Sequence, residues 1–174
     1  MVPDRRHRLF TVGRLDEDSE GLIIVTNDGE LAQRVSHPRH EVEKVYDLSI
    51  RGEIDTRDVK KVESGIWLSE GRTGRARMRI KRRGPKVSHV IVTIREGRNR
   101  EIRRMFARIE HPVISLRRIQ IGPIRDPKLK PGACRRLTAT EVKELLAVSG
   151  GAAPNEAKRR GRKPESRKRR PRRR

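Results

Sequence analysis

Two short segments hold the residues whose types and spacing could carry chemistry. Asp16 ends the sequence GRLD, just upstream of the apolar run 21–26, and Arg103 lies on segment 96–105, which opens with a glycine turn. A carboxylate near the core is costly to ionise unless a cation pairs with it. A buried carboxylate facing a guanidinium, with Tyr46 on a nearby strand, could act as a nucleophile or base without a metal. An ordinary ion pair between Asp16 and Arg103 is the other interpretation, and spacing alone favours it because ion pairs outnumber active sites.

Hydrophobic periodicity predicts the scaffold that positions these residues. Residues 21–26 (GLIIVT) suit a strand buried on both faces, and residues 44–50 alternate so that Tyr46 lies on the apolar face. Residues 99–110 predict the clearest helix, with Arg103 bordering its apolar stripe. Further strands are expected at residues 75–81, 87–95 and 113–121, and further helices at residues 55–63, around Leu31 and Val35, and after a capping box at Thr138 and Glu141. The irregular order of these elements predicts an α+β fold with a mixed, largely antiparallel sheet flanked by helices.

The charge of the chain points to a polyanionic partner. Lys and Arg number 45 against 23 Asp and Glu, for a formal net charge of +22. Residues 151–174 are rich in arginine and almost free of apolar residues, so they predict a disordered basic tail after a body of residues 1–150. The body is strongly basic even without the tail, which favours a nucleic-acid contact over a merely solvated surface.

The arginines of the body fall into two groups that could contact phosphates. The strand at residues 75–81 carries an unbroken basic face on one side, and the helix at residues 99–110 carries arginines on its outer face. These candidate nucleic-acid-binding residues are Arg75, Arg77, Arg79 and Lys81 on the strand, and Arg98, Arg100, Arg104 and Arg108 on or beside the helix.

Composition also excludes several classes of protein. Aromatic residues make up 2% of the chain, so a fold that reads bases on a row of surface aromatics does not fit. Trp67 is expected in the core rather than as a stacking platform. No apolar run is long enough to cross a membrane, and the first ten residues resemble no secretion signal, so a cytoplasmic location is expected. One cysteine excludes an internal disulfide framework, and a turn at Pro38 is a better interpretation of the spacing His37 to His40 than a metal site.

Several blocks of the sequence resemble one known family. GRLDEDSEGLIIVTNDGELA (residues 13–32), EKVY (residues 43–46), EGRNREIRRMF (residues 96–106), HPVISLRRIQIGPI (residues 111–124) and LKPGACRRLTATEV (residues 129–142) are similar to blocks of the RsuA/RluB group of pseudouridine synthases, in the same order. The EGRNR wording is closer to the RluB-like branch, which modifies large-subunit ribosomal RNA. The blocks span nearly the whole body.

The resemblance implies an enzyme that isomerises a specific uridine of ribosomal RNA to pseudouridine, with no metal or organic cofactor. It places the essential nucleophile or base at Asp16, the active-site tyrosine at Tyr46 and the arginine that pairs with the aspartate at Arg103. It also places Arg14 on the side that faces RNA. Nothing in the sequence calls for a dimer, so a monomer is expected.

The chain departs from that family near its amino terminus. Family members usually carry an S4-type RNA-binding domain and a first catalytic strand with a Lys-Pro-x-Gly turn, and neither is found in the fifteen residues before Asp16. Residues 1–150 are therefore interpreted as a catalytic domain that is incomplete at its amino terminus. The alternative is a non-catalytic, basic protein that binds ribosomal RNA and retains the synthase fold.

Overall fold

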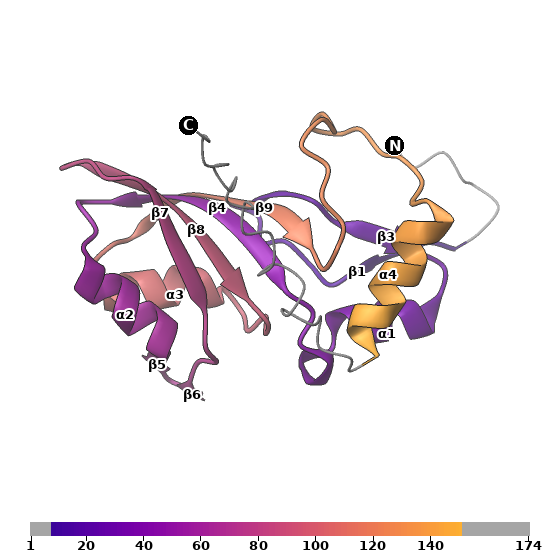
Figure 1. Ribbon diagram of the computed structural model, residues 1–174, viewed down its shortest axis with the longest axis horizontal. Coiled ribbons are helices and arrows are strands. Elements are labelled where there is room, and N and C mark those ends of the chain that lie inside the picture. The colour runs from indigo at the N-terminus through magenta and orange to yellow at the C-terminus, as the bar shows by residue number, and fades with distance from the viewer. Residues whose placement is uncertain (1–7, 151–174) are drawn as a thin grey trace, which may run out of the picture.

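A computed structural model describes residues 8–150 of the protein. A five-stranded sheet lies at its centre, and Figure 1 shows the long strands of this sheet. The strand order is β2 (Glu20–Gly21), β9 (Val113–Ile121), β4 (Lys44–Arg51), β8 (Val87–Ile94) and β7 (Arg77–Arg82). The pairing of β2 with β9 is parallel and the other pairings in this sheet are antiparallel. The predicted α+β class with a mixed, largely antiparallel sheet is thereby confirmed. The predicted basic tail, residues 151–174, lies outside the described residues.

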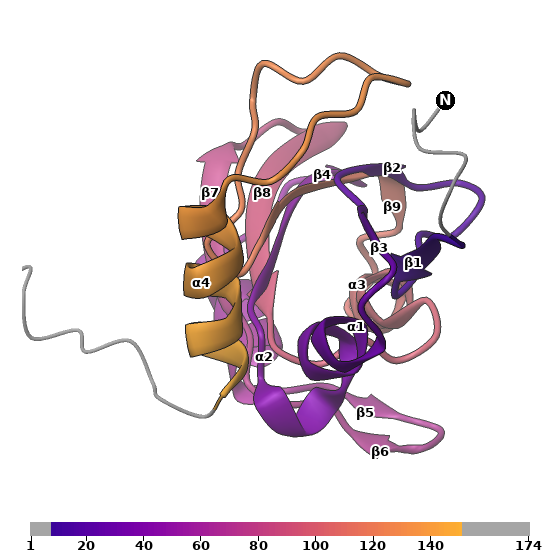
Figure 2. The same cartoon turned by 90° about the vertical axis from the view of Figure 1, so that its right-hand side faces the viewer.

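One end of the sheet is covered on a single face by two helices and a short hairpin. These elements are α2 (Thr56–Ser64), α3 (Glu101–Arg108) and the hairpin of β5 (Trp67–Leu68) and β6 (Gly71–Arg72), and Figures 1 and 2 show them on the same side of the sheet. The larger hydrophobic cluster lies between them and the strands, with Phe106 fully buried at its centre. The apolar stripe predicted for α3 is confirmed.

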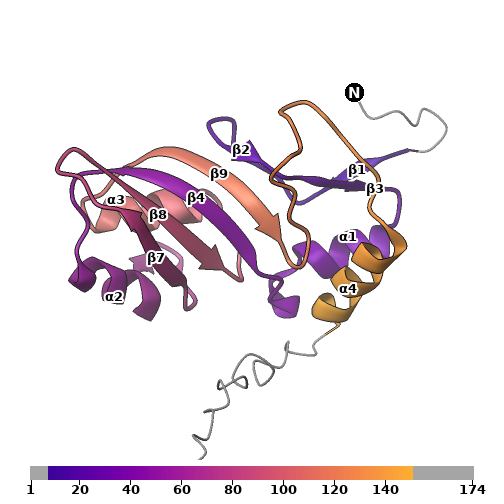
Figure 3. The same ribbon diagram turned by 45° about the horizontal axis from the view of Figure 1, so that its top comes forward.

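The other end has a second, smaller hydrophobic cluster. It is enclosed by β1 (Phe10–Val12), β3 (Ile24–Thr26), α1 (Gly29–Ser36) and α4 (Ala139–Ser149), which Figure 3 shows beside one another, and a single 3-10 turn, η1 (Pro38–His40), follows α1. Both helices begin with a side-chain cap, and the cap of α4 is the one that the sequence predicts. Asp28 Oδ1 accepts a hydrogen bond from the Leu31 N–H at 3.0 Å, and the capping box of α4 is formed in both directions. The two clusters leave a junction beneath the middle of the sheet.

The apolar run 21–26 is not the doubly buried strand that its composition predicts. It breaks at Leu22 and Ile23: β2 pairs with β9, whereas β3 pairs with β1 in a separate two-stranded sheet. Gly21 has a φ of 116°, and a Cβ there would lie 2.1 Å from the carbonyl oxygen of Arg118. This close approach bends the chain out of the central sheet, and Ile23 and Val25 consequently stay partly exposed.

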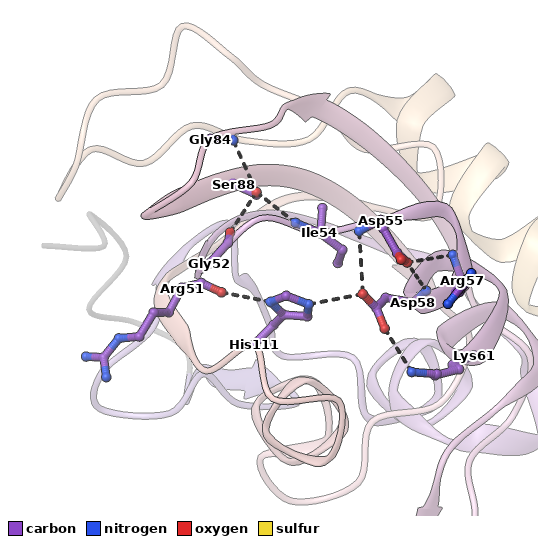
Figure 4. A network of polar contacts seen from close by, with 10 residues as sticks. All are labelled: Arg51, Gly52, Ile54, Asp55, Arg57, Asp58, Lys61, Gly84, Ser88 and His111. Atoms are coloured by element: carbon purple, nitrogen blue, oxygen red, sulfur yellow. Dashed lines mark hydrogen bonds and ion pairs between the residues drawn. The ribbon is translucent and has the colours of Figure 1, made fainter.

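A polar network fixes the connection between α3 and β9 (Figure 4). The His111 ring lies between the Arg51 carbonyl oxygen, 2.8 Å from Nδ1, and the Asp58 carboxylate, 3.1 Å from Nε2. Lys61 bonds the same carboxylate at 3.0 Å, and burial of Asp58 is outweighed by these two partners, so its pKa lies below the usual value. The network holds α2 against the start of β9 and so sets the position of the residues farther along that strand.

Trp67 is a second departure from expectation. Its side chain is 69% exposed, while Leu68 beside it is buried against the larger cluster. The hairpin is so short that alternation of side chains turns one residue inward and its neighbour outward. The expectation that Trp67 is a core residue is therefore wrong.

Candidate active site

A cavity of about 320 Å³ lies at the junction of the two hydrophobic clusters. Its wall combines apolar residues of both clusters with an unusual number of ionisable side chains. Those ionisable residues are Arg14, Asp16, Lys44, Tyr46, Arg98, Arg100, Glu101, Arg103 and Arg118. The three residues predicted to carry the chemistry, Asp16, Tyr46 and Arg103, therefore line one cavity.

Asp16 lies on the loop between β1 and β2. The loop turns at Gly13, which has a φ of 73°, and again where the Ser19 N–H donates to the Asp16 carbonyl oxygen at 2.9 Å. Asp16 is half-buried, and the hydrogen bonds and ion pairs found within residues 8–150 include none to its carboxylate. The carboxylate oxygens are thus available to a molecule that enters the cavity.

Tyr46 and Arg118 face the cavity from adjacent strands. They are directly opposite each other in the pairing of β4 with β9, so both side chains lie on the face of the sheet that carries the helices. Their exposed fractions are 8% and 4%. Burial raises the pKa of the Tyr46 phenol, and the Arg118 guanidinium beside it opposes that rise. The Asp16 carboxylate is close enough to act on the same phenol in the direction of burial.

Arg118 also holds both ends of the loop that carries Asp16. Its Nε donates to the Leu22 carbonyl oxygen at 2.7 Å, and its Nη1 donates to the Arg14 carbonyl oxygen at 3.4 Å. Its Nη2 is buried without a hydrogen-bond partner among residues 8–150. An unsatisfied buried guanidinium nitrogen is costly, so this N–H group is suited to bind an oxygen of a ligand in the cavity.

The predicted pair between Asp16 and Arg103 is not what the structure shows. Arg103 Nε lies 3.2 Å from Asp18 Oδ2, Nη2 donates to the Asp18 carbonyl oxygen at 2.6 Å, and Nη1 donates to the Val113 carbonyl oxygen at 3.2 Å. Arg100, one turn earlier, also pairs with Asp18 and holds the pKa of its carboxyl below the usual value. The turn after Asp16 brings Asp18, two residues later, to the face of α3, so Arg103 braces the loop.

Glu101 lines the side of the cavity next to α3 and is hydrogen-bonded to a second glutamate, Glu96, behind it. Glu101 is 4% exposed, and its Oε2 accepts a hydrogen bond from the Arg98 N–H at 3.0 Å. Its Oε1 is buried and accepts no hydrogen bond from an N–H group or a hydroxyl group of residues 8–150. Burial, reinforced by the hydrogen-bonded Glu96 carboxylate, raises the pKa of Glu101 to about 8. Burial would raise the pKa of Glu96 too, but hydrogen bonds from Glu101, the Gly74 N–H and Arg98 lower it. The two carboxyl groups thus hold one proton between them at neutral pH.

Lys44, Glu101 and Arg118 were not among the predicted site residues. Burial lowers the pKa of Lys44, with Arg118 acting in the same direction. The alternation of side chains along the strands could have identified Arg118 and Lys44. Arg118 lies two residues after Leu116, and Lys44 lies two residues before Tyr46, so each points to the buried face of the sheet. A charged residue at an inward position is rarely left without a role.

The basic face predicted on residues 75–81 lies on the wrong side of the sheet for the cavity. Arg77 and Arg79 are opposite Thr93 and Ile91, out of phase with Tyr46, so they project from the other face. That face is not an unbroken basic surface either, since Arg77 pairs with Glu43 at 2.6 Å and Lys81 pairs with Asp47 at 2.8 Å. A hollow of about 410 Å³ lies there, but its polar groups largely bond one another.

The remaining predicted RNA-binding residues lie at the cavity rim, on other parts of the surface, or in ion pairs within the fold. Arg14 and Arg100 are exposed at the cavity rim, and Arg75 and Arg108 are exposed elsewhere. Arg98 turns inward to Glu96 and to the carbonyl oxygens of Gly71 and Arg72, and Arg104 pairs with Glu70. Arg98 is therefore primarily a structural residue.

Some functional classes find no support in this arrangement. Among residues 8–150 no group of three or more His, Cys, Asp or Glu side chains could hold a metal ion. None of the helices described has the length and apolar character needed to span a bilayer.

Comparison with known proteins identifies relatives of this chain. Residues 3–108 match the family described as RNA pseudouridylate synthase. The chain is 40% identical to an uncharacterised RNA pseudouridine synthase of Aquifex aeolicus, over 86% of this chain and 60% of that protein. It is also 40% identical to ribosomal large subunit pseudouridine synthase B of Bacillus subtilis, over 82% of this chain and 59% of that protein. The chain thus spans about three fifths of the length of the curated relatives it matches.

Solved structures agree on the fold. A crystal structure of a pseudouridylate synthase superposes with a TM-score of 0.74 at 33% identity, over 79% of this chain and 59% of that one. The human RNA pseudouridylate synthase domain containing 1 superposes with a TM-score of 0.52 at 14% identity, over 85% of this chain and 83% of that one. At such low identity the second match shows the fold alone.

Proposed function

This chain belongs to the RNA pseudouridylate synthase family, within its RsuA/RluB group, and we propose that it converts a uridine of large-subunit ribosomal RNA into pseudouridine. In that isomerisation the bond from C1′ to N1 breaks, the uracil turns, and a bond from C1′ to C5 forms. C5 loses a proton and N1 gains one, so the reaction needs no co-reactant. The protein must supply a carboxylate, a pocket for the turning base and a way to hold the nucleotide.

The observation that carries this proposal is that the Asp16 carboxylate lines the cavity and has no hydrogen bond or ion pair within residues 8–150. It acts as the nucleophile or base that weakens the glycosidic bond, which requires oxygens that are not already bonded to the protein. The hydrogen bonds that Arg118 makes to the Arg14 and Leu22 carbonyl oxygens support this role, because they position the loop without occupying the carboxylate. The cavity is of the size that takes one small ligand group.

Tyr46 and Arg118 form the floor on which the base rests. A uridine within a helix cannot reach Asp16, so the nucleotide is flipped out of its stack at an expense of a few kcal/mol. The Tyr46 ring packs against the target uracil. The unpaired Nη2 of Arg118 binds an oxygen of the nucleotide and so offsets part of that expense.

Arg103 acts as a positioning residue, and Arg14 and Arg100 contact phosphates. Arg103 reaches the reacting carboxylate only through Asp18, whose main chain and side chain it holds. Arg14 and Arg100 lie at the rim of the cavity, where the backbone of an inserted nucleotide would pass. The strand arginines on the far face of the sheet are not part of this contact.

The proposal is tested by replacing one carboxylate. Asp16→Asn is expected to abolish pseudouridine formation in large-subunit ribosomal RNA while leaving RNA affinity within a few-fold of the wild type. Glu17→Gln is the matched control, since Glu17 is the next acidic residue, is exposed and does not line the cavity. Modification is mapped by chemical detection of pseudouridine in ribosomal RNA incubated with each protein.

Each outcome of the mapping is informative. Loss of modification with Asp16→Asn and retention with Glu17→Gln supports the catalytic role. An identical modification pattern for Asp16→Asn and the wild type excludes it and favours the non-catalytic ribosomal-RNA-binding alternative. Modification of small-subunit RNA instead of large-subunit RNA contradicts the target that the Bacillus subtilis relative's name suggests.

A further inference from the structure

The single tryptophan of the chain is displayed on the surface. Trp67 is 69% exposed, more than any other large hydrophobic side chain among residues 8–150. Its neighbours on either side, Ile66 and Leu68, pack on the larger hydrophobic cluster, so the hairpin is anchored while the indole points away from the anchor. An exposed indole of this size is favoured at surfaces that meet a partner.

The β5–β6 hairpin is rigidly joined to the wall of the cavity. Arg98, which lines the cavity, donates to the Gly71 carbonyl oxygen at 3.1 Å and to the Arg72 carbonyl oxygen at 2.8 Å. The Gly74 N–H donates to Glu96 on the same side, and Glu70 at the hairpin tip pairs with Arg104 of α3. Trp67 is therefore held in a fixed relation to the cavity and presents a preformed surface.

The strand facing Trp67 carries a cation. Arg72 is directly opposite Trp67 in the pairing of β5 with β6, and both side chains are exposed. Its Nε donates to the Gly65 carbonyl oxygen at 3.4 Å, which holds the stem along the hairpin. An exposed aromatic face with an exposed arginine on the facing strand matches the two parts of an unpaired nucleotide, a base that stacks and a phosphate that carries charge.

We propose that Trp67 and Arg72 form a stacking site for one unpaired base of the RNA substrate, outside the cavity that takes the target uridine. The proposal rests on the function proposed above in so far as the partner is RNA. The large positive charge of the chain makes a polyanion the fitting occupant rather than a second copy of this protein. Stacking is tolerant of sequence, so this site contributes affinity and orientation rather than a choice of base.

Because Trp67 is the only tryptophan, emission excited at a wavelength that Tyr46 does not absorb reports on this site alone. Titration of the full chain with a short oligouridylate is expected to quench the emission in a saturable way. An abasic oligonucleotide of equal length, which keeps the phosphates but has no base to stack, is expected to quench far less. Equal quenching by both probes, or a change in emission with protein concentration alone, overturns the proposal in favour of a purely ionic contact or a self-interface.

Variants test the affinity. Trp67→Ala is expected to weaken oligouridylate binding about 5- to 150-fold, the range that corresponds to loss of one stacked base. Trp67→Phe is expected to retain most of the affinity. Ile114→Ala, which removes another exposed hydrophobic side chain at 53% exposure on the opposite face of the sheet, is the matched control and should bind as the wild type does.

These outcomes separate the stacking site from the catalytic proposal. Unchanged affinity of Trp67→Ala, with pseudouridine still formed by the wild type, refutes the stacking site and leaves the catalytic proposal standing. Base-dependent quenching by a wild type that forms no pseudouridine supports the stacking site and refutes the catalytic proposal. Circular dichroism of each variant verifies that the fold is retained.

Discussion

Replacing Glu101 with glutamine should make the protein more stable at neutral and alkaline pH. Glu101 is buried beside Glu96, and the pair holds one proton between its carboxyl groups at neutral pH. A glutamine amide keeps the shape of the side chain and donates an N–H to Glu96 without needing that proton. The variant therefore removes the pH dependence and retains the hydrogen bond.

The size of the effect follows from the raised pKa. The pKa of Glu101 is about 8 in the folded protein against an ordinary value of 4.5, so its contribution is complete below pH 4.5 and is lost as the pH rises toward 8. The loss is about 1.4 kcal/mol for each pH unit, which amounts to roughly 3 kcal/mol by pH 7. The lowered pKa of Glu96 stabilises the fold above pH 4.5 and adds no slope within this window.

Urea denaturation followed by circular dichroism at pH 5, 6, 7 and 8 measures this slope. The free energy of unfolding of Glu101→Gln should exceed that of the wild type by a margin that grows with pH and is smallest at pH 5. Glu53→Gln, at an exposed glutamate far along the chain from this pair, is the control and should run parallel to the wild type. Parallel curves for Glu101→Gln and the wild type would refute the shared proton, because Glu101 would then be ionised in the fold.

Three further substitutions probe the loop and the core. Gly21→Ala places a Cβ 2.1 Å from the Arg118 carbonyl oxygen, so we expect it to separate β2 from β9, to lower the urea midpoint and to reduce pseudouridine formation. Asp18→Asn removes the ion pairs of Asp18 with Arg100 and Arg103. The Asp18 side chain is 45% exposed, so the thermal midpoint should fall little, while filter-binding affinity for RNA should rise a few-fold because one negative charge leaves the basic rim. Phe106→Ala empties a fully buried position and should lower the free energy of unfolding in urea by about 3–5 kcal/mol.

Local patterns in the sequence predicted most of the elements. β9 covers residues 113–121 as expected, α1 lies around Leu31 and Val35, and α4 starts with its capping box. Each of these depends on residues within a few positions of one another, where backbone propensity and capping act without help from the rest of the chain. The motif blocks that identify the family are likewise contiguous in the sequence.

Partners across the fold were decided by the tertiary structure. The sequence contains Asp16, Asp18, Arg103 and Arg118, but which cation meets which carboxylate depends on where the loop turns and on the register that sets Tyr46 opposite Arg118. The face from which the arginines of β7 project is also a matter of register, and a shift of one residue would move them to the cavity side. The spacing of residues along the chain determines which side chains share one face of a helix or strand. Which distant charges come into contact is fixed only when the strands and helices pack together.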